Sequence, residues 1–230
     1  PKNWISSSMR SKHSLADHAA ERTKHQQQSP PVNVFHLNRI WILFVPLLGF
    51  TACRVYPICN HINRQNLSFF GKEVSLLGLT EDDTLVDVGS GYGDVNMYYA
   101  MLRPGIHQVL IDTSKQLLND ENIAKLKDKA EKKAPRRFPF SYDIVHNTSD
   151  TIPLPAYSYQ KVLLRKTLHE MEHPEKMLRE INRILRKDGE LIIVEANPTR
   201  PFEVDEGCNK KYLTLRQIEQ VVQKAGFSLH

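Results

Sequence analysis

Short apolar runs alternate with helix-like periodic segments along the chain from residue 60 onward. Five runs of apolar and β-branched residues predict strands: Thr84–Val88, His107–Asp112, Tyr142–His146, Lys161–Arg165 and Glu190–Ala196. Five segments with apolar residues at every third or fourth position predict helices: Asn66–Leu79, Val95–Leu102, Ser114–Lys133, Pro174–Arg186 and Thr214–Ala225. Because strands that alternate with helices are typical of right-handed crossovers, the pattern predicts an α/β fold with a doubly wound, mainly parallel sheet.

The N-terminal residues do not follow this alternation, so we divide the chain into an extension, residues 1–59, and a domain, residues 60–230. Residues 1–35 contain three consecutive Gln and a Pro-Pro step but few large apolar side chains. This composition predicts a disordered or poorly packed segment.

Residues 40–50 are apolar throughout, and two interpretations of them stay open. Eleven apolar residues are fewer than the ~20 that span a bilayer, but they fit the core of a signal peptide. The following Phe50-Thr51-Ala52-Cys53 resembles the lipobox of bacterial lipoproteins, which implies membrane association through residues 40–53 and a mature chain that begins at Cys53. The alternative is an apolar helix or strand that packs on the following domain of a cytoplasmic protein.

Charge and cysteine content argue against a nucleic-acid partner, a disulfide framework and a metal site. The net charge is +5, but residues 1–72 hold nine Lys and Arg against two acidic residues, and the remainder holds 22 against 24. The domain itself is therefore not basic, and no nucleic-acid partner is indicated. Three cysteines are too few for a disulfide framework. Cys53, Cys59 and His61 do not have zinc-site spacing, so we expect no metal.

A glycine-rich loop follows the first predicted strand of the domain. Gly89, Gly91 and Gly93 stand at alternate positions, where the backbone can take positive φ and approach a ligand closely. Asp94 comes directly after them, and its charge disfavours the pyrophosphate of a dinucleotide. Asp112 ends the next strand, nineteen residues after Gly93, where a carboxylate can accept hydrogen bonds from two ribose hydroxyls. The loop therefore predicts a site for a cofactor that has a ribose but no phosphate.

Five motifs in fixed order carry a resemblance to a known family: Val86–Gly93, Asp112, Ile152–Pro155, Leu168–Glu170 and Glu180–Glu195. With this order and spacing, residues 69–227 resemble the class I S-adenosylmethionine-dependent methyltransferases, in the branch that contains many small-molecule methyltransferases. The resemblance implies a Rossmann-like methyltransferase fold, S-adenosylmethionine as cofactor and a small-molecule methyl acceptor.

The cofactor-binding residues that the resemblance implies are Asp87, Gly89, Ser90, Gly91, Tyr92, Gly93, Asp112, Thr113, Thr148, Ser149 and Asp150. Asp87 is expected to order the loop and to bind the amino group of the cofactor's methionyl part. The chain departs from the family at Asn147-Thr148-Ser149, where Gly-Asp-Ala is common. In the family this position contacts the adenine of the cofactor, so the departure affects that contact.

The family sheet normally has seven strands, of which the last two form an antiparallel hairpin. This chain stops where the sixth would begin, so the sheet is expected to be truncated after the helix at 214–225 and to expose an edge.

Candidate catalytic residues follow the fourth predicted strand. His169, with Glu170 beside it, is the candidate general base for an acceptor that must lose a proton. The alternative is a capping histidine without a chemical role. Glu195 ends the fifth strand and either faces the acceptor or caps the next turn. Arg165, unfavourable near a cationic cofactor unless paired, indicates an acidic substrate or partner.

The resemblance implies that the chain is an S-adenosylmethionine-dependent methyltransferase. Two alternatives stay open: a nucleotide-dependent oxidoreductase, and a degenerate cofactor-binding module that acts as a membrane-attached or assembly protein. The departures at 147–149 favour the second of these alternatives, and Asp94 argues against the first.

Overall fold

A single parallel sheet organises the molecule. The structure is a computed structural model that describes residues 39–45, 62–134, 137–196, 198, 200, 202–205 and 207–229. Among these residues, seven strands form one sheet in the order β4-β3-β2-β5-β6-β1-β7, and neighbouring strands are parallel. The strands are β1 (Arg39–Val45), β2 (Thr84–Val88), β3 (His107–Asp112), β4 (Ser141–His146), β5 (Tyr159–Arg165), β6 (Leu185–Ala196) and β7 (Ser228–Leu229).

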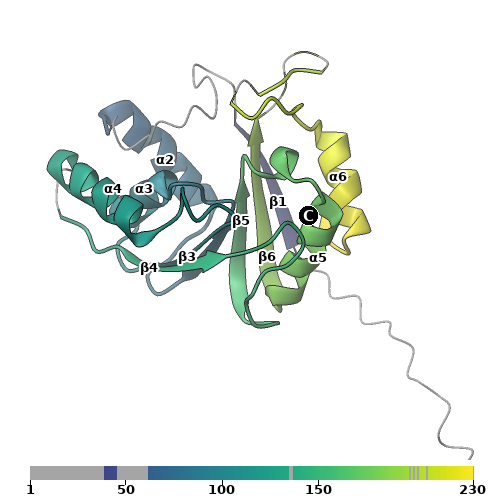
Figure 1. The fold of residues 1–230 in the computed structure, drawn as a ribbon, viewed down its shortest axis with the longest axis horizontal. Helices are drawn as coiled ribbons and strands as arrows, with labels where there is room; N and C mark the ends of the chain where they lie inside the picture. Colours follow the sequence, from purple (N-terminus) through teal and green to yellow (C-terminus); the bar gives the residue numbers. More distant parts are fainter. Residues whose placement is uncertain are drawn as a thin grey trace, which may run out of the picture. The chain divides into compact units, whose positions relative to one another are not determined.

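Helices cover both faces of this sheet, as Figure 1 shows. They are α2 (Arg64–Leu76), α3 (Asp94–Leu102), α4 (Asp120–Lys133), α5 (Pro174–Ile184) and α6 (Leu215–Lys224), with a short 3-10 helix, η2 (Leu168–Glu170). Leu110 of β3 packs in the core under α2, α3 and α4, whereas its neighbours Val109 and Ile111 pack in the core under α5 and α6. The predicted doubly wound parallel sheet is therefore confirmed.

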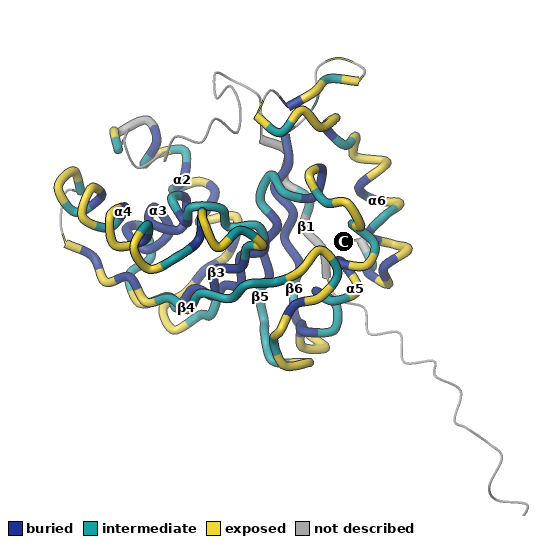
Figure 2. The backbone as a smooth tube through the Cα atoms, viewed as in Figure 1, coloured by how far each residue is buried: buried dark blue, intermediate teal, exposed yellow. Residues whose placement is uncertain are grey.

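Burial follows this layering (Figure 2). The central strands are buried on both faces, so their sequences are continuous apolar runs, which is the pattern expected of a parallel sheet covered by helices. Helix α5 buries Met177, Leu178, Ile181 and Ile184 and leaves its other side exposed. The periodicity of apolar residues in the sequence therefore predicts which side of each helix meets the sheet.

Element ends differ from the sequence prediction where local hydrogen bonds decide them. The helix predicted from Ser114 begins only at Asp120, because the side chain of Asn119 accepts a hydrogen bond from the backbone of Asn122 and caps it. The helix predicted to reach Arg186 ends at Ile184, and β6 begins directly at Leu185. Strands β2 and β3 have the predicted ends.

The sequence analysis did not assign β1 and β7. Strand β1 pairs with β6 over its whole length, from Arg39 opposite Glu190 to Val45 opposite Ala196, and β7 pairs with β1. Contrary to the expected open edge, the sheet therefore does not stop at β6. The antiparallel hairpin that ends the family's sheet is not found among the described residues. The strands beyond β6 are β1 and β7, and both run parallel to it.

Residues 39–45 thus take the packed arrangement, one of the two interpretations of the apolar segment, and Ile42 packs against the core under α5 and α6. Residues 1–38 and 46–61, which include Cys53 and the segment expected to be disordered, lie outside the described residues. Within the part of the chain that the structure describes, no helix has the length and apolar character needed to cross a membrane.

Removing β1 should destabilise the domain, because it exposes the backbone and apolar side chains of β6. A variant that lacks residues 1–45 should lose at least about 3 kcal/mol of unfolding free energy, since each ladder hydrogen bond contributes about 0.5–1.5 kcal/mol. For a domain of this size that corresponds to a melting temperature lower by about 6–12 °C. The matched control lacks only residues 1–35 and keeps β1. Equal melting temperatures for the two truncations, measured by circular dichroism, would contradict the role of β1.

Candidate functional site

The glycine loop joins β2 to α3 at the carboxyl edge of the sheet. The backbone N–H groups of Gly89 and Ser90 donate to the carbonyl oxygen of Ile111 at 2.8 and 2.9 Å, and the Ser90 hydroxyl donates to the same oxygen at 3.3 Å. Gly93 donates to the carbonyl of Ser90 at 2.9 Å and closes the turn. Tyr92 packs against the core under α2, α3 and α4. The loop is therefore held by its own backbone and by the end of β3.

The three glycines are required for different reasons. All three have positive φ, which side chains with a Cβ rarely adopt. A Cβ at Gly89 would lie 2.1 Å from Thr167 Cγ2, and one at Gly93 would lie 2.6 Å from Ile123 Cδ1, so protein atoms exclude larger residues there. A Cβ at Gly91 would meet none of the described residues within 4 Å. Gly91 is therefore the position where the backbone borders open space that a ligand can enter.

Asp112 connects the loop to the end of β3. Its Oδ2 accepts a hydrogen bond from the backbone of Gly91 at 2.9 Å, and its Oδ1 accepts one from the backbone of Ser114 at 2.8 Å. Because each carboxylate oxygen has two lone pairs, both oxygens can still accept hydrogen bonds from a ligand. Thr113, the next residue, is exposed. The carboxylate predicted to bind a ribose therefore lies directly beside the open position at Gly91.

Asp87 is buried at the end of β2 in a network of neutral amides. Its Oδ2 accepts a hydrogen bond from Asn96 Nδ2 at 3.0 Å, and Asn96 also bonds to Gln108. Its Oδ1 has no hydrogen-bond partner among the described residues. Burial raises the pKa of Asp87 to about 7, although the hydrogen bond from Asn96 and the charge of Arg165 oppose the shift. The site thus holds a carboxyl group with one acceptor oxygen still to be satisfied.

Arg165 forms a buried ion pair that crosses from β5 to α2. Its Nε lies 2.8 Å from Glu73 Oε1, and the hydroxyl of Tyr99 donates to the same carboxylate. The guanidinium also lies over the ring of Phe70, 5.4 Å from its centre. The interpretation of Arg165 as a sign of an acidic substrate is therefore wrong, because Glu73 neutralises it within the protein.

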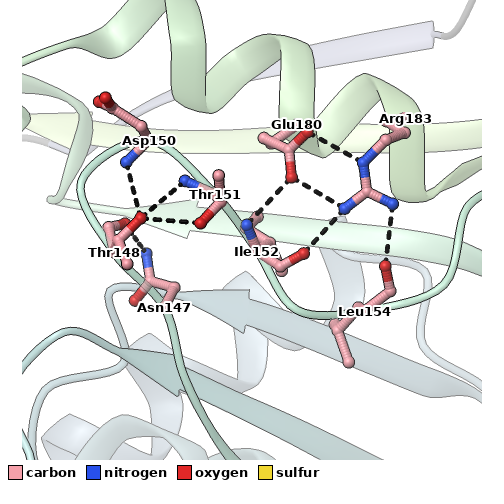
Figure 3. Close-up of polar contacts among 8 residues, drawn as sticks. All are labelled: Asn147, Thr148, Asp150, Thr151, Ile152, Leu154, Glu180 and Arg183. Atoms are coloured by element: carbon pink, nitrogen blue, oxygen red, sulfur yellow. Dashed lines mark hydrogen bonds and ion pairs between the residues drawn. The ribbon is translucent and has the colours of Figure 1, made fainter.

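The loop after β4 carries the three residues expected to contact adenine. Thr148 Oγ1 accepts hydrogen bonds from the backbone of Thr151 at 3.0 Å and of Asp150 at 3.3 Å, which folds the loop into a turn (Figure 3). The carboxylate of Asp150 pairs with Lys176 Nζ at 3.1 Å, and this hydrogen bond lowers the pKa of Asp150. Ser149 is exposed. Adenine contacts at Thr148, Ser149 and Asp150 stay predictions.

Two residues of α5 fasten the following part of this loop. Figure 3 shows Glu180 and Arg183 pointing from the helix toward the loop backbone. Glu180 Oε2 accepts from the backbone of Ile152 at 3.0 Å, and Arg183 donates to the carbonyl oxygens of Ile152 and Leu154 at 2.8 and 2.9 Å. An ion pair of 2.8 Å joins Arg183 to Glu180. The two side chains therefore set the path of the chain between β4 and β5.

His169 lies in η2 and is bound to the end of β6. Its Nδ1 is 2.8 Å from Glu195 Oε2, its backbone N–H donates to Glu195 Oε1 at 3.3 Å, and both side chains are 0% exposed. Glu195 therefore binds His169. The sequence analysis expected Glu195 to face the acceptor or to cap the next turn, and neither expectation includes this contact. Burial lowers the pKa of His169. The hydrogen bond and charge of Glu195, together with the charges of Glu170 and Asp205, raise this pKa by more, so the net shift is upward. Nε2 has no hydrogen-bond partner among the described residues.

The structure thus gathers the predicted residues into two groups at one edge of the sheet. Asp87, the glycines and Asp112 form the first group, at the ends of β2 and β3. His169 and Glu170 lie in the second, after β5, with Glu195 at the end of β6. Sequence reasoning missed the pairs Glu73–Arg165 and Glu195–His169, because no spacing pattern links residues so far apart in the chain.

Replacing Asp87 by Asn should change how stability depends on pH. Because the pKa of Asp87 lies above the ordinary 3.8, its contribution to stability is complete below about pH 3.8 and is lost as the pH rises through about 7. Asn cannot ionise. The unfolding free energy of Asp87→Asn, relative to that of the wild type, should therefore rise by up to about 4 kcal/mol between about pH 4 and pH 8. Urea unfolding across this range measures the difference. A difference that stays constant with pH would contradict a raised pKa at this position.

Comparison with known proteins agrees with this geometry. Residues 86–193 match the family described as "Methyltransferase domain". Curated relatives include proteins named demethylmenaquinone methyltransferase from Chlamydia trachomatis and Chlamydia muridarum. The first is 31% identical over 145 residues and the second 31% over 142 residues, and each match covers 62% of this chain and 56% of the relative. The chain therefore spans little more than half the length of these relatives.

Solved structures share the fold. A SAM-dependent methyltransferase from Aquifex aeolicus superposes with a TM-score of 0.57 at 20% identity, over 73% of this chain and 84% of that one. The YcgJ protein of Bacillus subtilis gives 0.51 at 16% identity, over 68% and 66%. The glycine loop, the acid at the end of β3 and the match over residues 86–193 agree with one another. Over residues 86–193 the chain therefore matches the methyltransferase domain family, and its fold is that of the class I S-adenosylmethionine-dependent methyltransferases.

Proposed function

We propose that the protein is an enzyme that transfers the methyl group of S-adenosylmethionine to a ring carbon of a small hydroquinone of the demethylmenaquinone type. The single observation that carries the transfer is the open space at Gly91, bordered by Asp112, within the matched domain. The acceptor class rests on the curated relatives at 31% identity, which are named demethylmenaquinone methyltransferases.

The residues of the first group fit this cofactor. Asp112 offers lone pairs to the two ribose hydroxyls while its existing bonds hold the loop. The unpartnered Oδ1 of Asp87 is a buried acceptor that suits the ammonium of the methionyl part, a donor of opposite charge. Asp94, at the start of α3, disfavours phosphate at the same place. We therefore assign ribose binding to Asp112 and amino-group binding to Asp87.

When bound, the cofactor supplies a methyl group that its positively charged sulfur already activates. The chain then has to orient the acceptor and exclude water, and this can provide most of the catalysis. Methylation at a ring carbon also releases a proton. His169 and Glu170 stay the predicted acid–base residues for that step, and Nε2 is the ring nitrogen available for it, because Glu195 holds Nδ1.

A side chain at Gly91 should block the cofactor without displacing protein atoms. Gly91→Val places its methyl groups in the open space, so binding of S-adenosylmethionine should fall below detection by isothermal titration calorimetry. The matched control is Gly78→Val, because Gly78 has the same φ of +56° and lies at the end of α2. Backbone strain is then similar in both variants. Binding that survives in Gly91→Val, or that is lost equally in Gly78→Val, would remove the loop from the site.

Turnover with a panel of acceptors tests the function. We expect the full chain to convert S-adenosylmethionine to S-adenosylhomocysteine with a reduced short-chain demethylmenaquinone, and to give a product heavier by one methylene unit in mass spectrometry. Catechol and primary amines should give no product. Asp112→Ala should weaken cofactor binding by about 1.5–3 kcal/mol and reduce turnover at limiting cofactor. Cofactor binding with turnover of another acceptor would contradict the quinone assignment alone, whereas absence of cofactor binding would contradict the whole proposal.

A further inference from the structure

Three side chains from two distant parts of the sequence meet beside the second group of site residues. A ring nitrogen of His169, a carboxylate oxygen of Glu170 and the Sγ of Cys208 lie within 4.8 Å of one another. We call these three residues the His169 cluster. Nitrogen, oxygen and sulfur donors in one place are the donor set of zinc-class sites.

The imidazole of His169 has the orientation of a metal ligand. Glu195 holds its Nδ1 at 2.8 Å, and with that contact the carboxylate fixes both the ring plane and the tautomer. The other nitrogen, Nε2, is buried without a hydrogen-bond partner among the described residues and lies 3.9 Å from Glu170 Oε1. A buried nitrogen with an unused lone pair is costly, and a cation at this position satisfies it.

The loop that carries Cys208 is built to hold the sulfur there. Asp205 Oδ1 accepts hydrogen bonds from the backbone of Gly207 at 2.7 Å and of Cys208 at 3.3 Å. The hydroxyl of Tyr212 donates to Asp205 Oδ2 at 2.6 Å, and the Tyr212 ring packs against His169 with the ring centres 5.2 Å apart. A continuous set of contacts therefore links Cys208 to His169 through Asp205 and Tyr212.

The charge around the cluster favours a cation. The acidic groups that act on His169 are Glu195, Glu170 and Asp205. Zinc ligands in a tetrahedral site lie about 3.5 Å apart, given bond lengths of about 2.0–2.3 Å. The side chain of Glu170 is 38% exposed and that of His169 is 0% exposed, so closure to this spacing requires movement of Glu170 and not of the buried histidine.

We propose that His169, Glu170 and Cys208 bind a divalent transition-metal ion of the zinc class, with Glu195 as the residue that orients His169. Three protein ligands leave the fourth position of a tetrahedral ion open. Such a site ties η2 to the loop at 203–212. Metal binding and the acid–base role of His169 are alternatives, because a metal ion and a proton compete for the same lone pair of Nε2, so the metal-bound chain has to transfer the proton without Nε2. The spacing argument against a metal missed this cluster, since its members come together only in the fold.

Metal titration of the full chain tests the site. After removal of bound metal with a chelator, the protein should bind one equivalent of Zn²⁺ in competition with a chromogenic chelator. With Co²⁺ it should show a thiolate-to-metal charge-transfer band and the strong visible absorption of tetrahedral cobalt. Cys208→Ser should abolish the charge-transfer band, and Glu195→Gln should lower Zn²⁺ affinity about 10–100-fold.

Two matched variants control for other cysteines and histidines. Cys59→Ser should retain the charge-transfer band, and His107→Gln should retain Zn²⁺ affinity, because His107 pairs with Asp143 on an exposed part of β3 and β4. If Glu195→Gln does not fold, Cys208→Ser decides, because Cys208 lies in a partly exposed turn. Absence of Zn²⁺ binding, or an unchanged cobalt spectrum in Cys208→Ser, would overturn the proposal. Calorimetry with S-adenosylmethionine is independent of this result, so the two proposals fail separately.

Discussion

A carboxyl group buried at the end of β2 is the constraint on which the cofactor side of the site depends. Asp87 is 3% exposed, and an ionised carboxylate at such a position is costly unless it is compensated. Asn96 donates a hydrogen bond to one carboxylate oxygen of Asp87 and another to the side chain of Gln108. The other oxygen has no partner among the described residues, and the pKa rises to about 7 because of burial. We propose that a cationic group of the cofactor supplies the missing interaction.

The surrounding charges are arranged so that they do not compete for this role. Arg165 on β5 acts electrostatically on Asp87, but it pairs with Glu73, which also accepts a hydrogen bond from Tyr99. This pair contributes little net charge to the site and joins α2 to the end of β5. The carboxylate of Asp112 likewise already accepts hydrogen bonds from the backbone of Gly91 and Ser114. The loop is therefore preorganised before a ligand arrives, which lowers the cost of binding.

Sequence reasoning predicts features that depend on neighbouring residues and misses those that depend on distant ones. Strands β2 and β3 have their predicted ends because both are buried apolar runs bounded by polar residues and glycine. The glycine loop is predictable because its steric requirement is local. In contrast, an isolated apolar run such as residues 40–50 fits a signal peptide and a strand equally well. Its pairing with β6, about 150 residues later in the chain, decides the matter only for residues 39–45.

The candidate site shows the same division. Motif spacing predicts Asp87, Gly91 and Asp112 as site residues; in the structure Gly91 donates to Asp112, and the charge of Asp112 acts on Asp87. The partner of Arg165 on α2 and the partner of His169 on β6 could not be assigned, since each lies on a different element. For that reason the sequence leads to a wrong interpretation of Arg165. It identifies His169 as a candidate, but the buried carboxylate partner of His169 and its proximity to Cys208 follow only from the fold.

The central claim is that the loop at 89–93 binds S-adenosylmethionine and not a nucleotide with phosphate groups. Calorimetric titration of the full chain with S-adenosylmethionine and with NADH tests it most directly. We expect stoichiometric binding of S-adenosylmethionine and no measurable heat with NADH, because Asp94 follows the loop and the unpartnered oxygen of Asp87 suits a cationic group. Binding of NADH in preference to S-adenosylmethionine would contradict the account.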